Sequence, residues 1–286
     1  MRGRTIAVPV LADVAAYLET RGIAAATLLA AADVPPHALA DRDSRIPFDA
    51  MPRAWDAAER LTGDPDVGLH SAEHPRTGAL GILGYVLLTS ATVGDALEAA
   101  ARWFTVLNSG LDFRVDDAGD ATRITLAPRD PQAAPLPRHM TEGILLGTVR
   151  QIAQLAGRDV APRAVAFAHP APAHGSREHG RLFGVPVRFG AEATVLEYPR
   201  TVRTLPIRSH QPSVRAALAA QAEQLTAALA RGDGVGERAR RAIAARLRMR
   251  VSTIGEVGRD LAMSARSIQS ALQDEGTTFQ ALIDDV

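Results

Sequence analysis

The sequence predicts an α+β domain followed by a small all-helical module. Over roughly the first hundred residues, apolar side chains recur at helical spacing. From residue 111 onward, segments that alternate apolar and polar residues are mixed with further helices. The glycine-rich stretch RGDGVGE then separates this part from a last helical segment. We therefore predict a helix-rich N-terminal domain with a small mixed or antiparallel sheet over residues 1–230, a linker at 231–236 and a helical module at 237–286.

The helices of the first part are predicted from apolar residues three and four positions apart. Leu11, Val14, Ala15 and Leu18 predict a first helix that stops at Gly22. Further helices are expected at 24–32, 48–61 and 67–73, each followed by glycine or proline. The segment 80–89 is apolar nearly all round, which indicates a buried helix. Thr92 is then the predicted N-cap of a long amphipathic helix that ends near Leu107.

A change of period marks the strands. LDFRVDD and TRITLAP alternate apolar and polar residues on either side of Ala-Gly-Asp, which predicts a hairpin. A helix over 137–156 follows, and AVAFAHP, PVRFG and TVLEYP are predicted to be extended. A short helix at 176–183 and a longer one at 212–229 complete the domain.

Composition excludes several classes of protein. The chain has no cysteine, so disulfides and thiolate metal sites are ruled out. Its longest apolar stretches are roughly ten residues, well short of a membrane span, and the N-terminus lacks the pattern of a signal peptide. We expect a cytoplasmic protein that has no membrane partner.

Charge is distributed unevenly although the total is zero. Residues 237–266 contain eight arginines against three carboxylates, a net charge of +5, whereas 267–286 contain only acidic charged residues. A neutral total argues against a protein that coats nucleic acid. The local basic cluster is nevertheless what a small DNA-binding module requires.

The C-terminal module has the spacing of a helix-turn-helix. A helix over 238–249 precedes a predicted capping box, Thr253 with Glu256, and a second helix that runs to about Leu261. Ser264 is the predicted N-cap of the third helix, and Thr277 with Gln280 is a second predicted capping box. In the third helix Ile268 and Leu272 should face inward, and the residues expected to face outward are Arg266, Ser267, Gln269, Ser270 and Gln273. The same spacing also fits an ordinary helical cap on the larger domain.

The segment VGRDLAMSARSIQSALQDEGTTFQALIDDV resembles the first helix-turn-helix of the AraC/XylS family of transcription regulators. The stretches LTGDPDVGLH, GALGILGYVLLTSATVGDALEAAARW and RLFGVPVRFGAEATVLEYP are similar to the arabinose-binding-like N-terminal ligand domain of one branch of that family. The resemblance implies a domain that binds an effector and dimerises, and DNA binding by two helix-turn-helix units joined by a long helix. By position, 264–274 is the first recognition helix and 279–286 begins the joining helix. The second unit is missing from this sequence.

The sequence departs from the family pattern in ways that predict weaker DNA binding. The family favours alanine and then glycine where this chain has Gly258 and Ala262, and glycine inside a helix costs about 1 kcal/mol. Ser270 and Ala271 replace a basic pair that would suit guanine edges or phosphates. The resemblance assigns the DNA-binding residues as Ser264, Arg266, Ser267, Gln269, Ser270 and Gln273.

Two groups of histidines raise the question of metal chemistry. His70, Glu73 and His74 form an HxxEH pattern, as in inverted zinc proteases, but no third ligand follows, and we favour a polar helix end. His169, His174 and His179 are interpreted as loop histidines near the surface. Since nucleotide-binding and nucleophile motifs are also absent, we predict no enzyme activity, no cofactor and no metal site.

Four residues around the predicted hairpin and the helix after it are candidates for binding the effector: Trp103, Phe113, His139 and Glu142. The alternative is that the two aromatic residues belong to the core and that His139 and Glu142 are exposed at a helix start.

The prediction as a whole is a one-component regulator that binds double-stranded promoter DNA under the control of an unidentified small molecule. We expect a homodimer, with RNA polymerase as a further candidate partner. The alternative is an effector-binding or heterodimerising module that has little DNA binding of its own because the second helix-turn-helix is missing.

Overall fold

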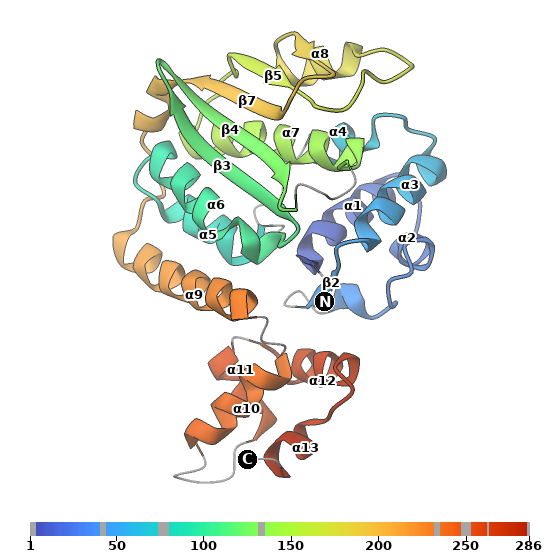
Figure 1. Cartoon of the computed structure of the whole chain (residues 1–286), viewed down its shortest axis with the longest axis vertical. Helices are drawn as coiled ribbons and strands as arrows, with labels where there is room; N and C mark the ends of the chain where they lie inside the picture. The colour runs from blue at the N-terminus through green and yellow to red at the C-terminus, as the bar shows by residue number, and fades with distance from the viewer. Residues whose placement is uncertain are drawn as a thin grey trace.

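The computed structural model describes residues 4–40, 44–73, 80–130, 135–231, 235–246, 253–261 and 263–284. A large N-terminal domain carries a sheet and most of the helices, and the last four helices form a separate lobe beneath it (Figure 1). The α+β class predicted for the N-terminal part and the all-helical C-terminal part are both confirmed.

Four helices open the chain at nearly the predicted positions: α1 (Val8–Thr20), α2 (Ala25–Ala31), α3 (Ala50–Thr62) and α4 (Val67–Ala72). The sequence analysis missed two short strands, β1 (Thr5–Ala7) and β2 (Arg45–Pro47), which pair antiparallel. Strands this short show no alternation, and each obtains its partner from a distant segment. The Arg45 guanidinium stabilises this pair by donating to the Thr5 hydroxyl at 2.7 Å. It also donates to the carbonyl of Val106, and so links the pair to a distant helix.

The predicted hairpin is the edge of a five-stranded mixed sheet. Its strands are β3 (Leu111–Ala118), β4 (Ala121–Pro128), β7 (Thr194–Pro199), β5 (Ala164–Ala166) and β6 (Val187–Arg188), which lie in that order. All neighbours are antiparallel except β5 and β6. The sheet is joined to the helices through β3, where Phe113 stacks on Phe104 with ring centroids 5.0 Å apart.

The other helices of the N-terminal domain are α5 (Gly81–Thr89), α6 (Val93–Leu107), α7 (Arg138–Ala156), α8 (Arg177–Phe183) and α9 (Pro212–Arg231). Two short 3-10 helices, η1 (Ala38–Ala40) and η3 (Arg200–Thr204), accompany them. The predicted N-cap of α6 is confirmed, because Thr92 and Asp95 form a capping box. Helix α5 is mostly buried as predicted, although Tyr85 on it is 53% exposed. The Trp103 indole donates to Glu223 at 2.8 Å and so ties α9 to α6.

Helices α4 and α7 cross unusually closely at Gly68. A Cβ atom added at Gly68 would lie 2.4 Å from the carbonyl oxygen of His139, a separation that no side chain could adopt. Glycine is therefore required here, and the close crossing brings the start of α4 against the first turns of α7.

The C-terminal module consists of α10 (Val235–Arg246), α11 (Ile254–Leu261), α12 (Ala265–Asp274) and α13 (Phe279–Asp284). Helix α10 begins three residues before the predicted start, and its first amides are capped by Glu275, which accepts from the backbone N–H groups of Val235 and Gly236 at 2.5 and 2.9 Å. Residues 232–234 of the predicted linker lie outside the described residues, so its bounds stay a prediction.

None of the helices in the described ranges is both long enough and apolar enough to cross a membrane.

Candidate ligand cavity and candidate DNA-binding helix

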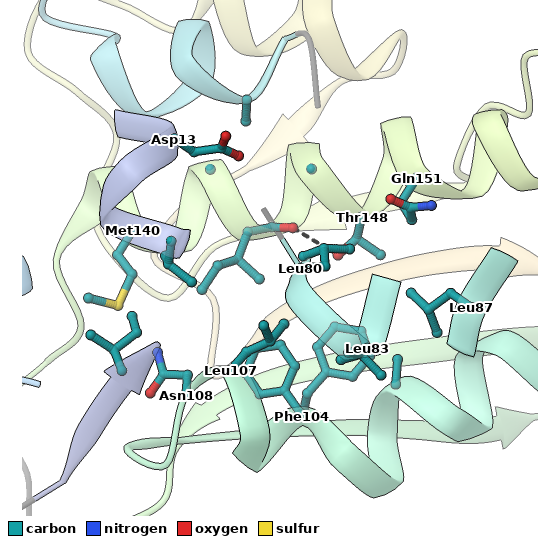
Figure 2. Close-up of a pocket in the computed structure, with 18 of the residues that line it drawn as sticks. Asp13, Leu80, Leu83, Leu87, Phe104, Leu107, Asn108, Met140, Thr148 and Gln151 are labelled. Atoms are coloured by element: carbon teal, nitrogen blue, oxygen red, sulfur yellow. Dashed lines mark hydrogen bonds between the residues drawn. The ribbon is translucent and has the colours of Figure 1, made fainter. Parts of the chain in front are cut away.

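A cavity of about 200 Å³ lies inside the N-terminal domain, between α1, α3, α5, α6 and α7 (Figure 2). Most of its lining is aliphatic or aromatic, with Trp55, Phe104 and Phe113 supplying the rings. The polar side chains that line it are Asp13, Ser71, Asn108, Thr148 and Gln151. A mostly apolar enclosure with a few polar groups is the usual form of a small-molecule site.

The space exists partly because one face of α7 lacks side chains. Gly143, Gly147 and Gln151 follow one another at intervals of four residues, so they lie along the same face of α7, and all three line the cavity. A Cβ added at Gly147 would meet no described atom within 4 Å, whereas one added at Gly143 would lie 3.0 Å from the carbonyl oxygen of Gly68. The lack of a side chain at Gly143 therefore allows α7 to lie close to α4, and the lack of one at Gly147 leaves open space in the cavity.

The polar groups of the lining differ in whether they are already paired. The Thr148 hydroxyl donates to the carbonyl of Ile144 at 2.8 Å, and Asn108 accepts from the backbone of Gly110 at 2.9 Å. The Gln151 side chain is only 6% exposed, yet its Nε2 has no hydrogen-bond partner among the described residues. An unpaired buried donor costs about 1–3 kcal/mol, so this amide is suited to a ligand acceptor.

A second feature, here called the histidine cluster, surrounds the fully buried Glu142 where α7 meets α8. Glu142 lies 2.6 Å from His179 Nε2 and 3.4 Å from the Arg138 guanidinium. His169 Nε2 is 3.7 Å from the same carboxylate, and His139 Nε2 is 2.9 Å from Glu59. Burial lowers the pKa of His169 below its usual value, more than the neighbouring Pro170 carbonyl and Glu142 raise it. These contacts hold α8 on the start of α7.

Asp64, at the start of α4, is the centre of a neighbouring polar group. It accepts from the Tyr17 hydroxyl and from His70 Nδ1, each at 2.7 Å. Burial alone would raise the pKa of Asp64, but the hydrogen bonds from Tyr17 and His70 outweigh it and lower that pKa. Burial would likewise lower the pKa of His70, but Asp64 and then Glu178 raise it. Burial, reinforced by Asp64, raises the pKa of Tyr17 to about 12.

The four predicted ligand residues lie in three different places. Phe113 lines the cavity, whereas Trp103 lies in a groove between α6 and α9. His139 and Glu142 are in the histidine cluster, 5% and 0% exposed. The alternative that these two are exposed is therefore wrong, because α4 and α8 cover the first turns of α7. The sequence analysis missed Gly147 and Gln151, although their spacing on one helix face was a signal that could have found them.

The structure also changes the interpretation of the other histidines. His179 is fully buried on α8 and paired with Glu142, so the prediction of a surface loop is wrong for it, while His174 is exposed. In the HxxEH pattern, His70 binds Asp64, Glu73 contacts Arg181 at 3.3 Å, and His74 lies outside the described residues. No group of three metal-ligating side chains suited to a metal ion occurs within the described ranges.

Most of the residues predicted to face outward from α12 are exposed, and Ser267 and Ser270 are not. Ser264 caps the helix by accepting from the Ser267 backbone at 3.0 Å, and Arg266, Gln269 and Gln273 are exposed. Ser270 is half-buried. Ser267 was expected to face outward but is only 2% exposed, since its hydroxyl lies 2.6 Å from that of Ser264 in the turn.

Of the two capping boxes predicted in this module, the first is confirmed and the second is wrong. Glu256 accepts from the Thr253 backbone at 3.0 Å, and the Glu256 backbone donates to the Thr253 hydroxyl at 3.4 Å. At α13 the cap is Thr278, which accepts from the Ala281 backbone at 3.2 Å, and not Thr277. The predicted box of Thr277 and Gln280 is therefore wrong: a single cap one residue later takes its place, because Ala281 has no side-chain acceptor to complete a box.

Gly258 has a packing role that the sequence comparison did not suggest. A Cβ atom there would lie 2.6 Å from the carbonyl oxygen of Met263, and the Met263 backbone donates to the Gly258 carbonyl at 2.8 Å. The glycine thus allows the turn before α12 to close against α11, in place of simply weakening the helix. Ala262, the other departure, lies outside the described residues, as do Arg248 and Arg250 of the basic cluster.

Comparison with known proteins gives three concordant results. Residues 22–207 match the family described as the arabinose-binding domain of AraC transcription regulators, N-terminal. The ornithine utilization regulator of Pseudomonas aeruginosa is 32% identical over 269 residues, which cover 93% of this chain and 77% of that protein. The crystal structure of the transcriptional regulator CdpR from Pseudomonas aeruginosa has a similar fold, with a TM-score of 0.53 at 21% identity, over 96% of this chain and 81% of that one.

Proposed function

The chain belongs to the AraC family of transcription regulators, and on that premise we propose that a small molecule bound in the N-terminal cavity controls DNA binding by α12. The observation that carries the DNA-binding half is the two-sided character of α12. Ile268 and Leu272 are fully buried in the module, while Arg266, Gln269 and Gln273 are exposed. A helix with an apolar inner face and a polar outer face of this kind is what a major groove accepts.

The three exposed side chains have the chemistry for reading bases. Arg266, Gln269 and Gln273 are three and four positions apart, so they share one face of the helix. Glutamine can form two hydrogen bonds with adenine, and arginine can do so with guanine. Ser264 and Ser267 hold the turn in shape through their own hydrogen bond, so we assign them a positioning role beside the groove.

The arrangement of the two parts supports control of α12 by the N-terminal domain. Arg266, Gln269 and Gln273 border a groove that they share with His37 and Ala40 of the N-terminal domain. We take the protein to exchange between a form in which α12 lies against the N-terminal domain along this groove and a form in which α12 is free. An effector in the cavity that binds one form more tightly would shift the fraction of molecules whose α12 is free for DNA. We further propose a cytoplasmic homodimer, because a second copy would double the DNA contacts, with RNA polymerase as a partner at the promoter.

A selection experiment tests the DNA-binding half. The full chain is incubated with a random pool of DNA duplexes, and enriched sequences are then titrated by fluorescence anisotropy. We expect an enriched motif, and we expect the triple variant R266A/Q269A/Q273A to bind it at least about tenfold more weakly, since each base contact contributes about 1–3 kcal/mol. Loss of one phosphate or guanine contact at Arg266 should also flatten the salt dependence by about one unit of slope.

The matched control is R177A, which removes an exposed arginine from α8 of the N-terminal domain. It should leave affinity and salt dependence unchanged. If the wild-type protein enriches no motif, or if the triple variant binds as well as the wild type, α12 is not the DNA-reading helix. Binding of small molecules without any enriched motif would instead favour the alternative of an effector-binding module.

A further inference from the structure

We propose that the cavity takes an uncharged amphiphile, a medium-length aliphatic or cyclic hydrocarbon that carries one carbonyl-type acceptor. The proposal rests on the proposed function only in taking this cavity as the effector site. It differs from what the family description suggests, because that description speaks of a sugar.

The lining disfavours a sugar. A monosaccharide brings several hydroxyl groups, and each must find a hydrogen-bond partner when it leaves water. The cavity wall consists mainly of side chains such as Leu83, Leu87 and Phe104. Thr148 and Asn108 already have backbone partners. Most hydroxyls of a bound sugar would therefore lose their water without replacement.

Charge on the lining disfavours ions as well. Among the described residues that line the cavity there is no arginine, lysine or histidine, and the one ionisable side chain is Asp13. A carboxylate ligand would therefore find no cation among these described residues, and its transfer from water into a mostly apolar cavity would cost free energy. The carboxylate of a zwitterionic amino acid would meet the same cost. An uncharged molecule avoids it.

Gln151 supplies the polar end of the site. It lies on α7 beside Thr148 at the border of the cavity (Figure 2), and its Nε2 has no hydrogen-bond partner among the described residues. A carbonyl oxygen from a ketone, ester, lactone or amide would accept from this donor. The ligand then satisfies the buried amide while its hydrocarbon part fills the apolar remainder.

The size of the cavity limits the hydrocarbon part. An apolar cavity of about 150 Å³ is large enough to bind benzene. A cavity of about 200 Å³ therefore points to a chain or ring system of roughly seven or eight carbons. The open space at Gly147 is part of this room.

Calorimetric titration of the full chain tests the ligand class with five probes: octanamide, 2-octanone, octanoate, L-arabinose and L-ornithine. We expect octanamide and 2-octanone to bind, octanoate to bind at least about tenfold more weakly because its carboxylate loses its water in a mostly apolar cavity, and the other two to give no heat of binding. Saturable binding of arabinose or ornithine in the cavity, with no binding of the amphiphiles, overturns the proposal.

Two variants place the binding in this cavity. Gln151→Leu keeps the size of the side chain and removes the donor, so octanamide should bind about fivefold more weakly. Gly147→Leu fills the open space and should abolish binding, whereas the control Gly255→Leu, on an exposed helix position outside the cavity, should have no effect. Unchanged affinity in Gln151→Leu overturns the assignment of the donor even if Gly147→Leu misfolds.

The failure of this inference can be told apart from failure of the proposed function. If amphiphiles bind and the variants respond as expected, but DNA affinity is the same with and without them, the ligand class stands and control of DNA binding fails. If a sugar or an amino acid binds in the cavity and changes DNA affinity, the function stands and the ligand class fails.

Discussion

The hydrophobic cores of the two parts of this protein differ sharply in size and in what they enclose. The N-terminal domain has one continuous core that runs from the first helices through the sheet to α9. The core of the C-terminal module has six buried side chains among the described residues: Ala239, Ile243, Val257, Ile268, Leu272 and Leu282. The N-terminal core also encloses a cavity and a buried polar cluster, whereas the buried polar side chains described in the small module, Glu256 and Ser267, lie at the helix caps.

The difference follows from the free energy that each core supplies. A large core can lose some packing around a cavity and still remain folded, because the cost is a small part of the total burial. A small core contributes little free energy of unfolding in total, so the loss of one of its side chains is enough to destabilise the whole module. The part that senses a ligand can therefore contain empty space, and the part that contacts DNA cannot.

A matched pair of leucine truncations tests this contrast most severely. Leu272→Ala in the small core and Leu145→Ala in the large core remove the same group from sites that are 1% and 0% exposed. Each should cost about 2–5 kcal/mol. We expect Leu272→Ala to unfold the C-terminal module at room temperature, and Leu145→Ala to leave both parts folded with a lower melting temperature.

Circular dichroism and backbone amide NMR spectra of the full chain measure both outcomes. Loss of the signals of α10–α13 alone in Leu272→Ala is the expected pattern. If both variants lower one common unfolding transition by the same amount, the two cores unfold as one unit and the contrast between them is wrong.

A pair of glycine substitutions in α11 tests whether the turn before α12 requires a glycine at position 258. Gly258→Ala places a Cβ atom 2.6 Å from the Met263 carbonyl oxygen and should destabilise the module by about 1–3 kcal/mol. Gly255→Ala meets no described atom within 4 Å and should stabilise it by about 0.5 kcal/mol. Chemical denaturation followed by helical circular dichroism gives both values, and equal stabilisation by both alanines would show that the turn does not need Gly258.

The smallest expected effect is a pH dependence confined to the N-terminal domain, since no histidine follows His210. The pKa of His70 is raised above its usual 6.5 in the folded protein, so its contribution to stability is complete below pH 6.5 and is lost as the pH rises through the folded pKa. The pKa of His169 is lowered by burial, so its contribution is present above pH 6.5 and is lost as the pH falls.

Denaturation of His70→Gln and His169→Gln at about pH 5.5 and pH 8 separates the two contributions. Relative to the wild type, His70→Gln should lose more stability at the lower pH, by up to about 1 kcal/mol for a partly exposed pair. His169→Gln should show the opposite trend. The same sign of change in both variants would contradict the two pKa directions.

The structure of the C-terminal module could be predicted from the sequence more completely than that of the N-terminal domain. In the C-terminal module, α11 and α12 follow from apolar spacing over one or two turns, and the caps Ser264 and Thr253 act on amides three residues away. These are local relations, which a sequence displays directly. The errors there, at Ser267 and Thr277, both lie at helix starts, where a shift of one residue changes which side chain faces inward.

In the N-terminal domain most elements were predictable, β1 and β2 excepted, but the contacts between elements were not. The cavity is lined by residues of β1, α1, α3, α4, α5, α6, β3 and α7, whose positions in the sequence extend from Ile6 to Leu155. Glu142 meets His179 because α8 folds back on α7, and β1 meets β2 across about forty residues. The spacing of apolar residues within one helix or strand does not indicate which distant element will pack against it.

The amino-acid sequence alone was sufficient for the fold class, the family and the polar face of α12, because periodicity, capping and a contiguous motif depend on neighbours along the chain. The close crossing at Gly68, the open space beside Gly147 and the unpaired amide of Gln151 became visible only once the helices were packed. Those features depend on which backbone approaches which across long separations, and the proposed ligand class depends on them.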